Sequence, residues 1–173
     1  HARLLTMLGE QLIRNDRVAL VELIKNSYDA DAVQVQVDFR AFSDELEANR
    51  SSEIVLTDDG HGMTERVVRE QWMSPATAAK RDEKQHTPRT ALGRTMQGEK
   101  GIGRFAIFKL GSRATVVTRG RDQPDEIVLK FDLSSLDEDL HAPAPSSKSA
   151  AKYLDEFPVE YSVRAPIAFP GRG

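Results

Sequence analysis

The chain has 173 residues, of which 39% are hydrophobic and 29% are charged, and its formal net charge is −3. These proportions are typical of a globular domain with its own hydrophobic core, and the small net charge predicts neither a strongly basic nucleic-acid surface nor an acidic tail. The absence of cysteine excludes a disulfide scaffold and cysteine metal sites and is typical of a reducing, cytoplasmic location. No apolar run has the length of a membrane span. Because the chain starts at His1 and stops at Gly173, we expect one domain, 1–173, cut from a longer protein.

The first thirty residues predict two helices. Residues 3–14 have an amphipathic pattern, and residues 17–28 form a second helix that Asp16 could cap. The second helix is rich in Val, Leu, Ile and Ala, so we expect it to be largely buried.

Strands and turns follow. Val33, Val35, Val37 and Phe39 alternate with polar residues, which indicates a half-buried strand. Further strands are expected at 53–57, 114–119, 126–133 and 159–164, helices at 64–73 and 101–110, and loops at 43–52, 74–100 and 141–151. Helices come first and strands later, without regular alternation of the two. The order favours an α+β fold, a two-layer sandwich in which helices cover one face of a mixed, mostly antiparallel sheet.

The helix at 17–28 carries polar side chains at a helical spacing. Glu22, Asn26 and Asp29 stand at i, i+4 and i+7, which places them on one side of the helix. A carboxylate and a carboxamide on an otherwise apolar helix need partners. A metal ion, water and phosphate oxygens would all serve.

A second block is Asp58-Asp59-Gly60-His61-Gly62, directly after a strand. A carboxylate at a strand end can accept a hydrogen bond from an exocyclic amine such as that of adenine. Gly60 and Gly62 would let the backbone approach a flat ring. Alone, the block is also compatible with an ordinary turn.

A third block, Gly98 to Phe105, is rich in glycine and opens a helix, a combination that can bind anions. The P-loop pattern fails because Glu99-Lys100-Gly101 follows the glycine pair at 93 and 98. The dinucleotide pattern fits the letters from Gly101 to Ala106, but no strand precedes it.

Together, the three blocks resemble the boxes of the GHKL superfamily of Bergerat-fold ATPases, with the strongest similarity to the branch of MORC proteins, MutL and the ninety-kilodalton heat-shock chaperone. The resemblance covers about 18–118 and implies binding and hydrolysis of ATP with Mg²⁺. In this interpretation Glu22 is the general base and Asn26 binds Mg²⁺. Asp29 lies near the sugar or supports the site, whereas Asp31 is a cap or surface residue.

The resemblance also assigns the remaining contacts. Asp58, rather than Asp59, binds the adenine amino group. Met63 packs on the adenine or, alternatively, in the core. The other contacts to the nucleotide are assigned to Gly60, Gly62, Gly98, Lys100, Gly101, Ile102, Gly103 and Arg104. The segment 74–100 would be the ATP lid.

Two features of the family are missing from the chain. A late-strand threonine that contacts adenine would come just after Gly171-Arg172-Gly173, and Thr115 and Thr118 are poor substitutes for it. The lysines that a following domain supplies are also absent, so we expect weak hydrolysis by the fragment alone.

The expected role is that of an N-terminal ATPase module in an ATP-dependent homodimer, a switch or clamp that reaches nucleic acid through other domains and does not enter a membrane. The alternatives are a histidine-kinase-type phosphotransfer domain and a nucleotide-binding module without turnover. The presence of Glu22 favours hydrolysis.

Overall fold

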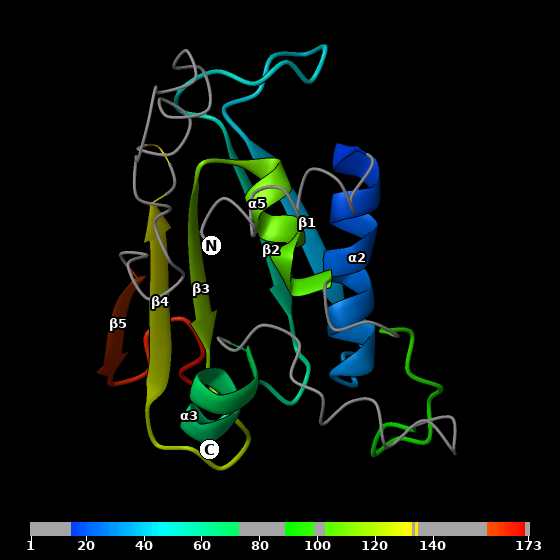
Figure 1. Ribbon diagram of the computed structural model, residues 1–173, viewed down its shortest axis with the longest axis vertical. Coiled ribbons are helices and arrows are strands. Elements are labelled where there is room, and N and C mark those ends of the chain that lie inside the picture. Colours follow the sequence, from blue (N-terminus) through cyan, green and yellow to red (C-terminus); the bar gives the residue numbers. More distant parts are fainter. Residues whose placement is uncertain (1–14, 73–88, 99–102, 133, 135–158, 172–173) are drawn as a thin grey trace, which may run out of the picture.

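The computed structural model describes residues 15–72, 89–98, 103–132, 134 and 159–171 (Figure 1). Its helical elements are α2 (Asp16–Asp29), α3 (Glu65–Val67) with the π-helical turn η1 (Val68–Trp72), the 3₁₀ turn η2 (Gly103–Ala106) and α5 (Ile107–Leu110). Its strands are β1 (Val35–Arg40), β2 (Glu53–Asp58), β3 (Arg113–Thr118), β4 (Glu126–Asp132) and β5 (Val159–Arg164). The predicted helix at 3–14, the loop at 141–151 and the part of the predicted lid at 74–88 lie outside the described residues.

The described strands form two antiparallel sheets. β1 pairs with β2, with Val35 opposite Asp58, and β4 lies between β3 and β5 in the second sheet. Figure 1 shows α5 between α2 and β3, and α2 and α5 are in contact. The α+β class is therefore confirmed. Every ladder between described strands is antiparallel, and these strands make two sheets where one mixed sheet was expected.

The main core lies on β4, the central strand of the second sheet, where side chains from η1 and α5 pack against it. Ile127, Leu129 and Phe131 are buried together with Val68 of η1. The rings of Trp72 and Phe108 lie 5.7 and 5.4 Å from that of Phe131. Burial of these side chains holds the α3–η1 turn against the sheet.

Helix α2 differs from its prediction in two ways. Its cap is Asn15, whose Oδ1 accepts the Val18 N–H at 3.0 Å, and Asp16 is the first helical residue. Among its residues only Ala19 and Ser27 are buried, whereas Val21 is 49% exposed, so the prediction of a largely buried helix was wrong. The described helical elements that pack on α2, η2 and α5, are each four residues long, so part of its apolar surface stays exposed.

Strand β1 begins at Val35, two residues later than the alternating pattern indicated. Val33 is 81% exposed. The N–H groups of Val33 and Gln34 both donate to Asp59 Oδ1, at 2.7 and 2.9 Å. These two residues therefore belong to a turn fastened to Asp59.

Candidate nucleotide-binding site

Helix α2 presents Glu22 and Asn26 to the start of η2. A Cβ atom on Gly103 would lie 3.2 Å from Glu22 Oε2 and 3.3 Å from Asn26 Oδ1. Packing brings these groups close together. Ala19 and Leu23 of α2 pack with Ala106 and Leu110, which holds η2 and α5 against the helix. The first and third sequence blocks therefore meet, and glycine at position 103 permits this close approach.

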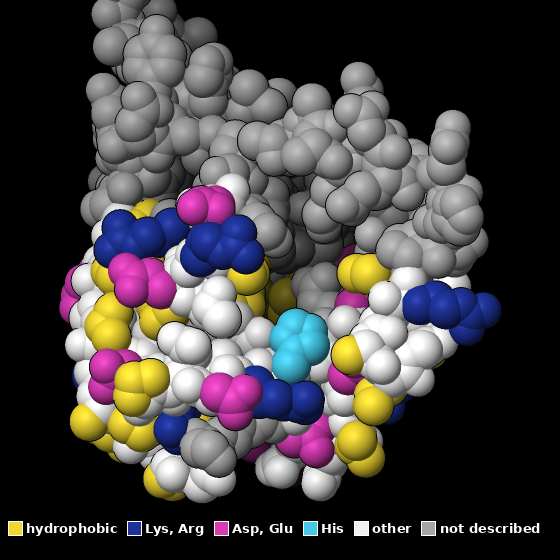
Figure 2. All heavy atoms as spheres, turned by 90° about the horizontal axis from the view of Figure 1, so that it is seen from below, with side chains coloured by type: hydrophobic (Ala, Val, Ile, Leu, Met, Phe, Trp, Pro, Cys, Tyr) yellow, Lys and Arg dark blue, Asp and Glu magenta, His cyan; other side chains and the backbone are white. Residues whose placement is uncertain are grey.

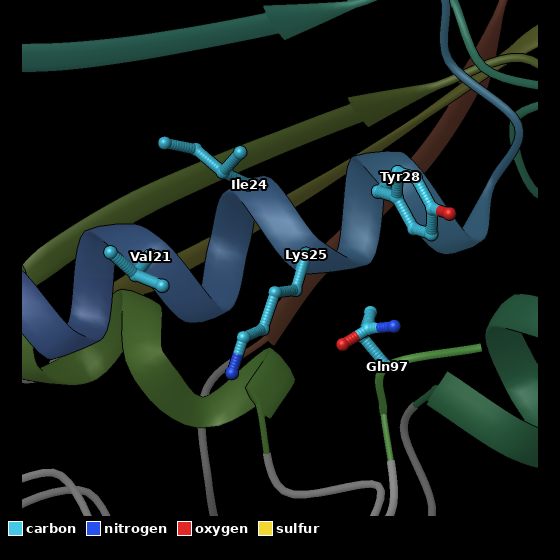
Figure 3. Close-up of a pocket in the computed structure, with 5 residues that line it drawn as sticks. All are labelled: Val21, Ile24, Lys25, Tyr28 and Gln97. Atoms are coloured by element: carbon cyan, nitrogen blue, oxygen red, sulfur yellow. The ribbon is translucent and has the colours of Figure 1, made fainter. Parts of the chain in front are cut away.

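Glu22 has a cationic neighbour that the sequence analysis did not single out. Lys25 Nζ lies 2.8 Å from Glu22 Oε1. Lys25 also lines a groove of about 300 Å³ together with Val21, Ile24, Tyr28 and Gln97. Figure 3 shows Lys25 and Ile24 leaving α2 on opposite sides, with Gln97 facing the helix from another segment. Neither Glu22 nor Asn26 lines this groove; the Glu22 side chain is partly exposed and Asn26 is exposed.

The carboxylate of Asp58 is held at the end of β2. Its Oδ1 accepts the Gly60 N–H at 2.9 Å, and its Oδ2 accepts the Ser27 hydroxyl at 3.0 Å. Ser27 is 3% exposed and lies next to Asn26 on α2. The second block is therefore joined to the first by a partly buried side-chain hydrogen bond. Asp59 instead holds the turn before β1, as described above.

The two glycines of the second block are required by close backbone contacts. A Cβ on Gly60 would lie 2.8 Å from the Ala30 carbonyl oxygen, which accepts the His61 N–H at 2.8 Å. Gly62 has φ +65°, and a Cβ there would lie 1.9 Å from the Arg119 carbonyl oxygen. The loop is thus wedged between the end of α2 and the residues after β3.

Met63 and Thr118 connect this loop to the second sheet. The Met63 N–H donates to Thr118 Oγ1 at 2.9 Å, and Met63 packs against the core around Leu129. The packing favours the core alternative for Met63. Thr118 is 7% exposed and supports the loop, a role that the sequence analysis did not foresee.

Asp29 accepts two backbone N–H groups of the predicted lid. Its Oδ1 and Oδ2 each lie 2.8 Å from a donor, the N–H groups of Gln97 and Gly98. A Cβ on Gly98 would lie 2.9 Å from Asp29 Oδ2, so glycine permits this approach. Asp29 therefore positions the start of the third block.

Two further contacts fasten the same segment. Asp31, at φ +60°, is 8% exposed and its Oδ2 accepts the Leu92 N–H at 3.1 Å. Burial opposes its ionisation, but hydrogen bonds from Thr90 and Leu92 and the charge of Arg94 lower its pKa below the ordinary value. Arg94 also donates to the Ala32 carbonyl oxygen at 2.6 Å. The interpretation of Asp31 as a cap or surface residue was wrong, because the carboxylate is buried under the segment 89–98.

Part of the third block lies outside the residues that the structure describes. Lys100, Gly101 and Ile102 lie outside the described residues, and Arg104 is described only as backbone of η2. Among the described residues, no cluster of three or more His, Asp or Glu side chains could hold a metal ion. Figure 2 shows acidic and basic side chains interspersed on the face that it presents, with no large patch of one sign.

Helix α2 thus contacts all three blocks, because Glu22 and Asn26 lie close to Gly103 and Ser27 donates to Asp58. The family model described as "Histidine kinase-, DNA gyrase B-, and HSP90-like ATPase" matches residues 14–158. The chain belongs to this GHKL family of ATPases. Its general function is to bind ATP, and domains of this family are usually ATPases.

One relative of this GHKL domain is the "Putative type II restriction enzyme HgiDII" of Herpetosiphon aurantiacus. It is 30% identical over 112 residues, which are 65% of this chain and 16% of the relative. The chain therefore spans about a sixth of the relative's length. In the described part of the GHKL domain, no helix has the length and apolar character needed to cross a membrane.

Proposed function

We propose that the chain binds Mg·ATP between α2 and the loop Asp58–Met63 and hydrolyses it with Glu22 as general base. One observation carries the proposal: Asn26 and Glu22 face the glycine of η2, while Ser27, on the same helix, holds Asp58. One helix thereby supports both ends of an elongated ligand. A nucleotide triphosphate has the matching polarity, with a hydrogen-bonding base at one end and anions at the other.

The base is assigned to the Asp58 end. Both carboxylate oxygens of Asp58 already accept one hydrogen bond, which fixes their direction, and each has acceptor capacity left for an exocyclic amine. Gly60 and Gly62 complete this end, and Met63 packs in the core behind it. Asp58→Asn should weaken ATP binding by about tenfold or more, because the amide cannot accept at both positions. Asp59→Asn is the matched control and should leave ATP affinity within about twofold.

The phosphates are assigned to Asn26 and Gly103, joined by Lys100, Gly101, Ile102 and Arg104, whereas Gly98, whose N–H donates to Asp29, supports the start of this block. Asn26 Oδ1 is a hard oxygen ligand in an exposed position, which fits a Mg²⁺ ion that takes most of its ligands from phosphates and water. When bound, Mg²⁺ would neutralise phosphate charge. Asp29 acts from behind by holding the backbone of Gln97 and Gly98.

Glu22 is assigned to water activation. Its carboxylate would take a proton from water as the water oxygen forms a bond to the γ-phosphorus, and the bond from that phosphorus to the β–γ bridging oxygen breaks to release ADP. Lys25 holds Glu22 Oε1 by an ion pair and leaves Oε2 directed towards Gly103. The pair thus orients the carboxylate towards the proposed phosphate position.

Substitution of Glu22 tests the chemistry separately from binding. Glu22→Gln should lower phosphate release by about 100-fold or more, with ATP affinity within about threefold. Glu160→Gln, an exposed glutamate paired with Lys130, is the control and should change neither quantity. ATP binding without any release in the unmodified protein would select the module without turnover.

We further propose that the domain is the ATPase module of a longer dimerising protein that acts with nucleic acid, in a branch near MORC and MutL. The glutamate in the first block supports turnover, and the similarity to a protein named as a restriction enzyme supports a nucleic-acid context. Light scattering of the full-length protein should show a dimer with a non-hydrolysable ATP analogue and a monomer without nucleotide. Labelled phosphate on a histidine of that protein would favour phosphotransfer instead.

A further inference from the structure

The segment after β5 is fastened to the second sheet at two adjacent residues. The Ala168 N–H donates to Glu126 Oε2 at 2.9 Å, and the Phe169 carbonyl oxygen accepts from Arg119 Nη1 at 2.7 Å. Glu126 is fully buried, and its other oxygen accepts from Arg164 Nε at 2.7 Å. Figure 1 shows this red segment returning to the sheet after β5.

The buried guanidinium of Arg119 donates hydrogen bonds to main-chain carbonyl groups. The residue is 7% exposed, and its Nε donates to the Gln123 carbonyl oxygen at 2.8 Å, in addition to the bond to Phe169. Removal of a guanidinium from water is costly, and an apolar side chain could fill such a position at least as favourably. The fixed fork of the guanidinium has a different advantage, because it holds two backbone segments at one defined spacing.

The main chain around Arg119 lies directly against the loop that we assign to the base. The Arg119 carbonyl oxygen occupies the space beside Gly62, as described above. The Met63 N–H donates to Thr118 Oγ1 and the Arg121 N–H donates to the His61 carbonyl oxygen, both at 2.9 Å. Residues 118–121 are therefore bonded along residues 61–63, so one stretch cannot shift without the other.

We infer that Arg119 is a positioning residue that couples the placement of the segment 165–171 to the base-side loop of the nucleotide site. The inference rests on the proposed function, because it needs the base to bind at this loop. A displacement of Phe169 pulls on the Arg119 side chain, and the Arg119 backbone carries the shift to Gly62. By linkage, base binding changes the free energy of displacing the segment by the same amount.

The test is a double-mutant cycle on ligand affinity in this chain, read by calorimetry. Arg119→Gln removes the connection, and Glu126→Gln loosens the segment at its other anchor. ATP and inorganic tripolyphosphate are the two probes. Arg119→Gln should weaken ATP by about fivefold or more and tripolyphosphate by less than about twofold. Glu126→Gln should weaken ATP in the unmodified background and have no further effect in Arg119→Gln.

Three results would overturn the inference: unchanged ATP affinity in Arg119→Gln, an equal loss for both probes, or independent effects of the two substitutions. Glu160→Gln is the control for a glutamate on the same sheet. If Arg119→Gln does not fold, Arg119→Lys retains the charge without the fork, and the same criteria apply to it. Hydrogen exchange of the Met63 N–H gives a readout without ligand, and it should rise in Glu126→Gln only while Arg119 is present.

Asp58→Asn, measured in parallel, separates this inference from the proposed function. If Asp58→Asn does not weaken ATP, the base is bound elsewhere and the proposed function fails. If Asp58→Asn weakens ATP and Arg119→Gln does not, the proposed function stands and the coupling through Arg119 is refuted.

Discussion

The two ends of the candidate site are built in opposite ways. At the base side, Gly60 and Gly62 are wedged against the backbones of Ala30 and Arg119, and both oxygens of Asp58 are already bonded. At the phosphate side, Asn26 is exposed and Glu22 is held by one partly exposed lysine. The proposed base side is therefore organised without a ligand, whereas the proposed phosphate side has more exposed side chains for which a ligand can supply contacts.

Substitution of Gly62 should have the largest effect on the free energy of unfolding. Gly62→Ala places a methyl group into the Arg119 carbonyl at a left-handed backbone angle, so we expect a loss of about 4 kcal/mol in the free energy of unfolding. Urea denaturation measures it. Gly93→Ala is the control, because its φ is +78° and no atom lies within 4 Å of its Cβ position. That change should cost only about 1 kcal/mol, the backbone penalty alone. Equal losses would show that the wedge is unimportant.

Acid should weaken the support of the base side. Burial opposes ionisation of Glu126, but the hydrogen bond from Arg164 and the N–H groups of Ala168 and Ile167 lower its pKa below 4.5. A lowered folded-state pKa gives stability that is complete above 4.5 and is lost as the pH falls through the folded-state value. Glu126→Gln should lower the thermal midpoint at pH 7 by roughly 5 °C and flatten its acid dependence below pH 4.5. A variant with an unchanged acid limb would contradict the role of Glu126.

Ser27 should matter for affinity more than for folding. Ser27→Ala removes the hydroxyl that donates to Asp58 Oδ2, so the carboxylate loses its fixed direction and ATP affinity should fall by about tenfold. Calorimetry checks it. Ser43→Ala in the exposed loop before β2 is the control and should leave affinity unchanged. A loss confined to stability would make Ser27 a packing residue.

The proposed phosphate side should tolerate the loss of one side-chain contact with little change in stability. Lys25→Met removes a partly exposed ion pair, and such pairs are worth little, so stability should change by less than about 1 kcal/mol. ATP affinity should stay within about threefold, while the rate of phosphate release changes because Glu22 loses its orientation. Steady-state kinetics separates the two quantities. A large loss of binding would place Lys25 on the nucleotide itself.

The helix cap lies away from both ends, so we expect no effect on ATP affinity and only a modest one on stability. Asn15→Ala should cost about 1 kcal/mol, because the Val18 N–H loses its acceptor. Asp16→Ala should cost less, since only a favourable first-turn charge is lost. Thermal unfolding of the two variants distinguishes the observed cap from the predicted one.

Local patterns predicted much of this molecule. The bounds of β5 agree with the prediction, and β2 and β4 agree within one residue, because alternation and flanking turn residues are local properties. The spacing of Glu22 and Asn26 correctly placed them on one side of α2. The exposure of Val21 was not foreseen, since a hydrophobic stripe does not reveal how much of it the neighbouring elements cover.

The contacts that support the site could not be read in the same way. Ser27, Thr118 and Arg119 act on residues 31, 55 and 50 positions away, respectively. Their side chains carry no distinctive spacing. The reason that Gly62 must be glycine is the Arg119 carbonyl, which only the folded backbone brings near.

The fastening of Arg89–Gly98 to the end of α2 has a consequence for the candidate site. Four hydrogen bonds, accepted by Asp29, Asp31 and Ala32, tie this stretch to the helix that carries Glu22. Residues 89–98 therefore form one unit with the C-terminal end of α2 and belong to the frame of the candidate site.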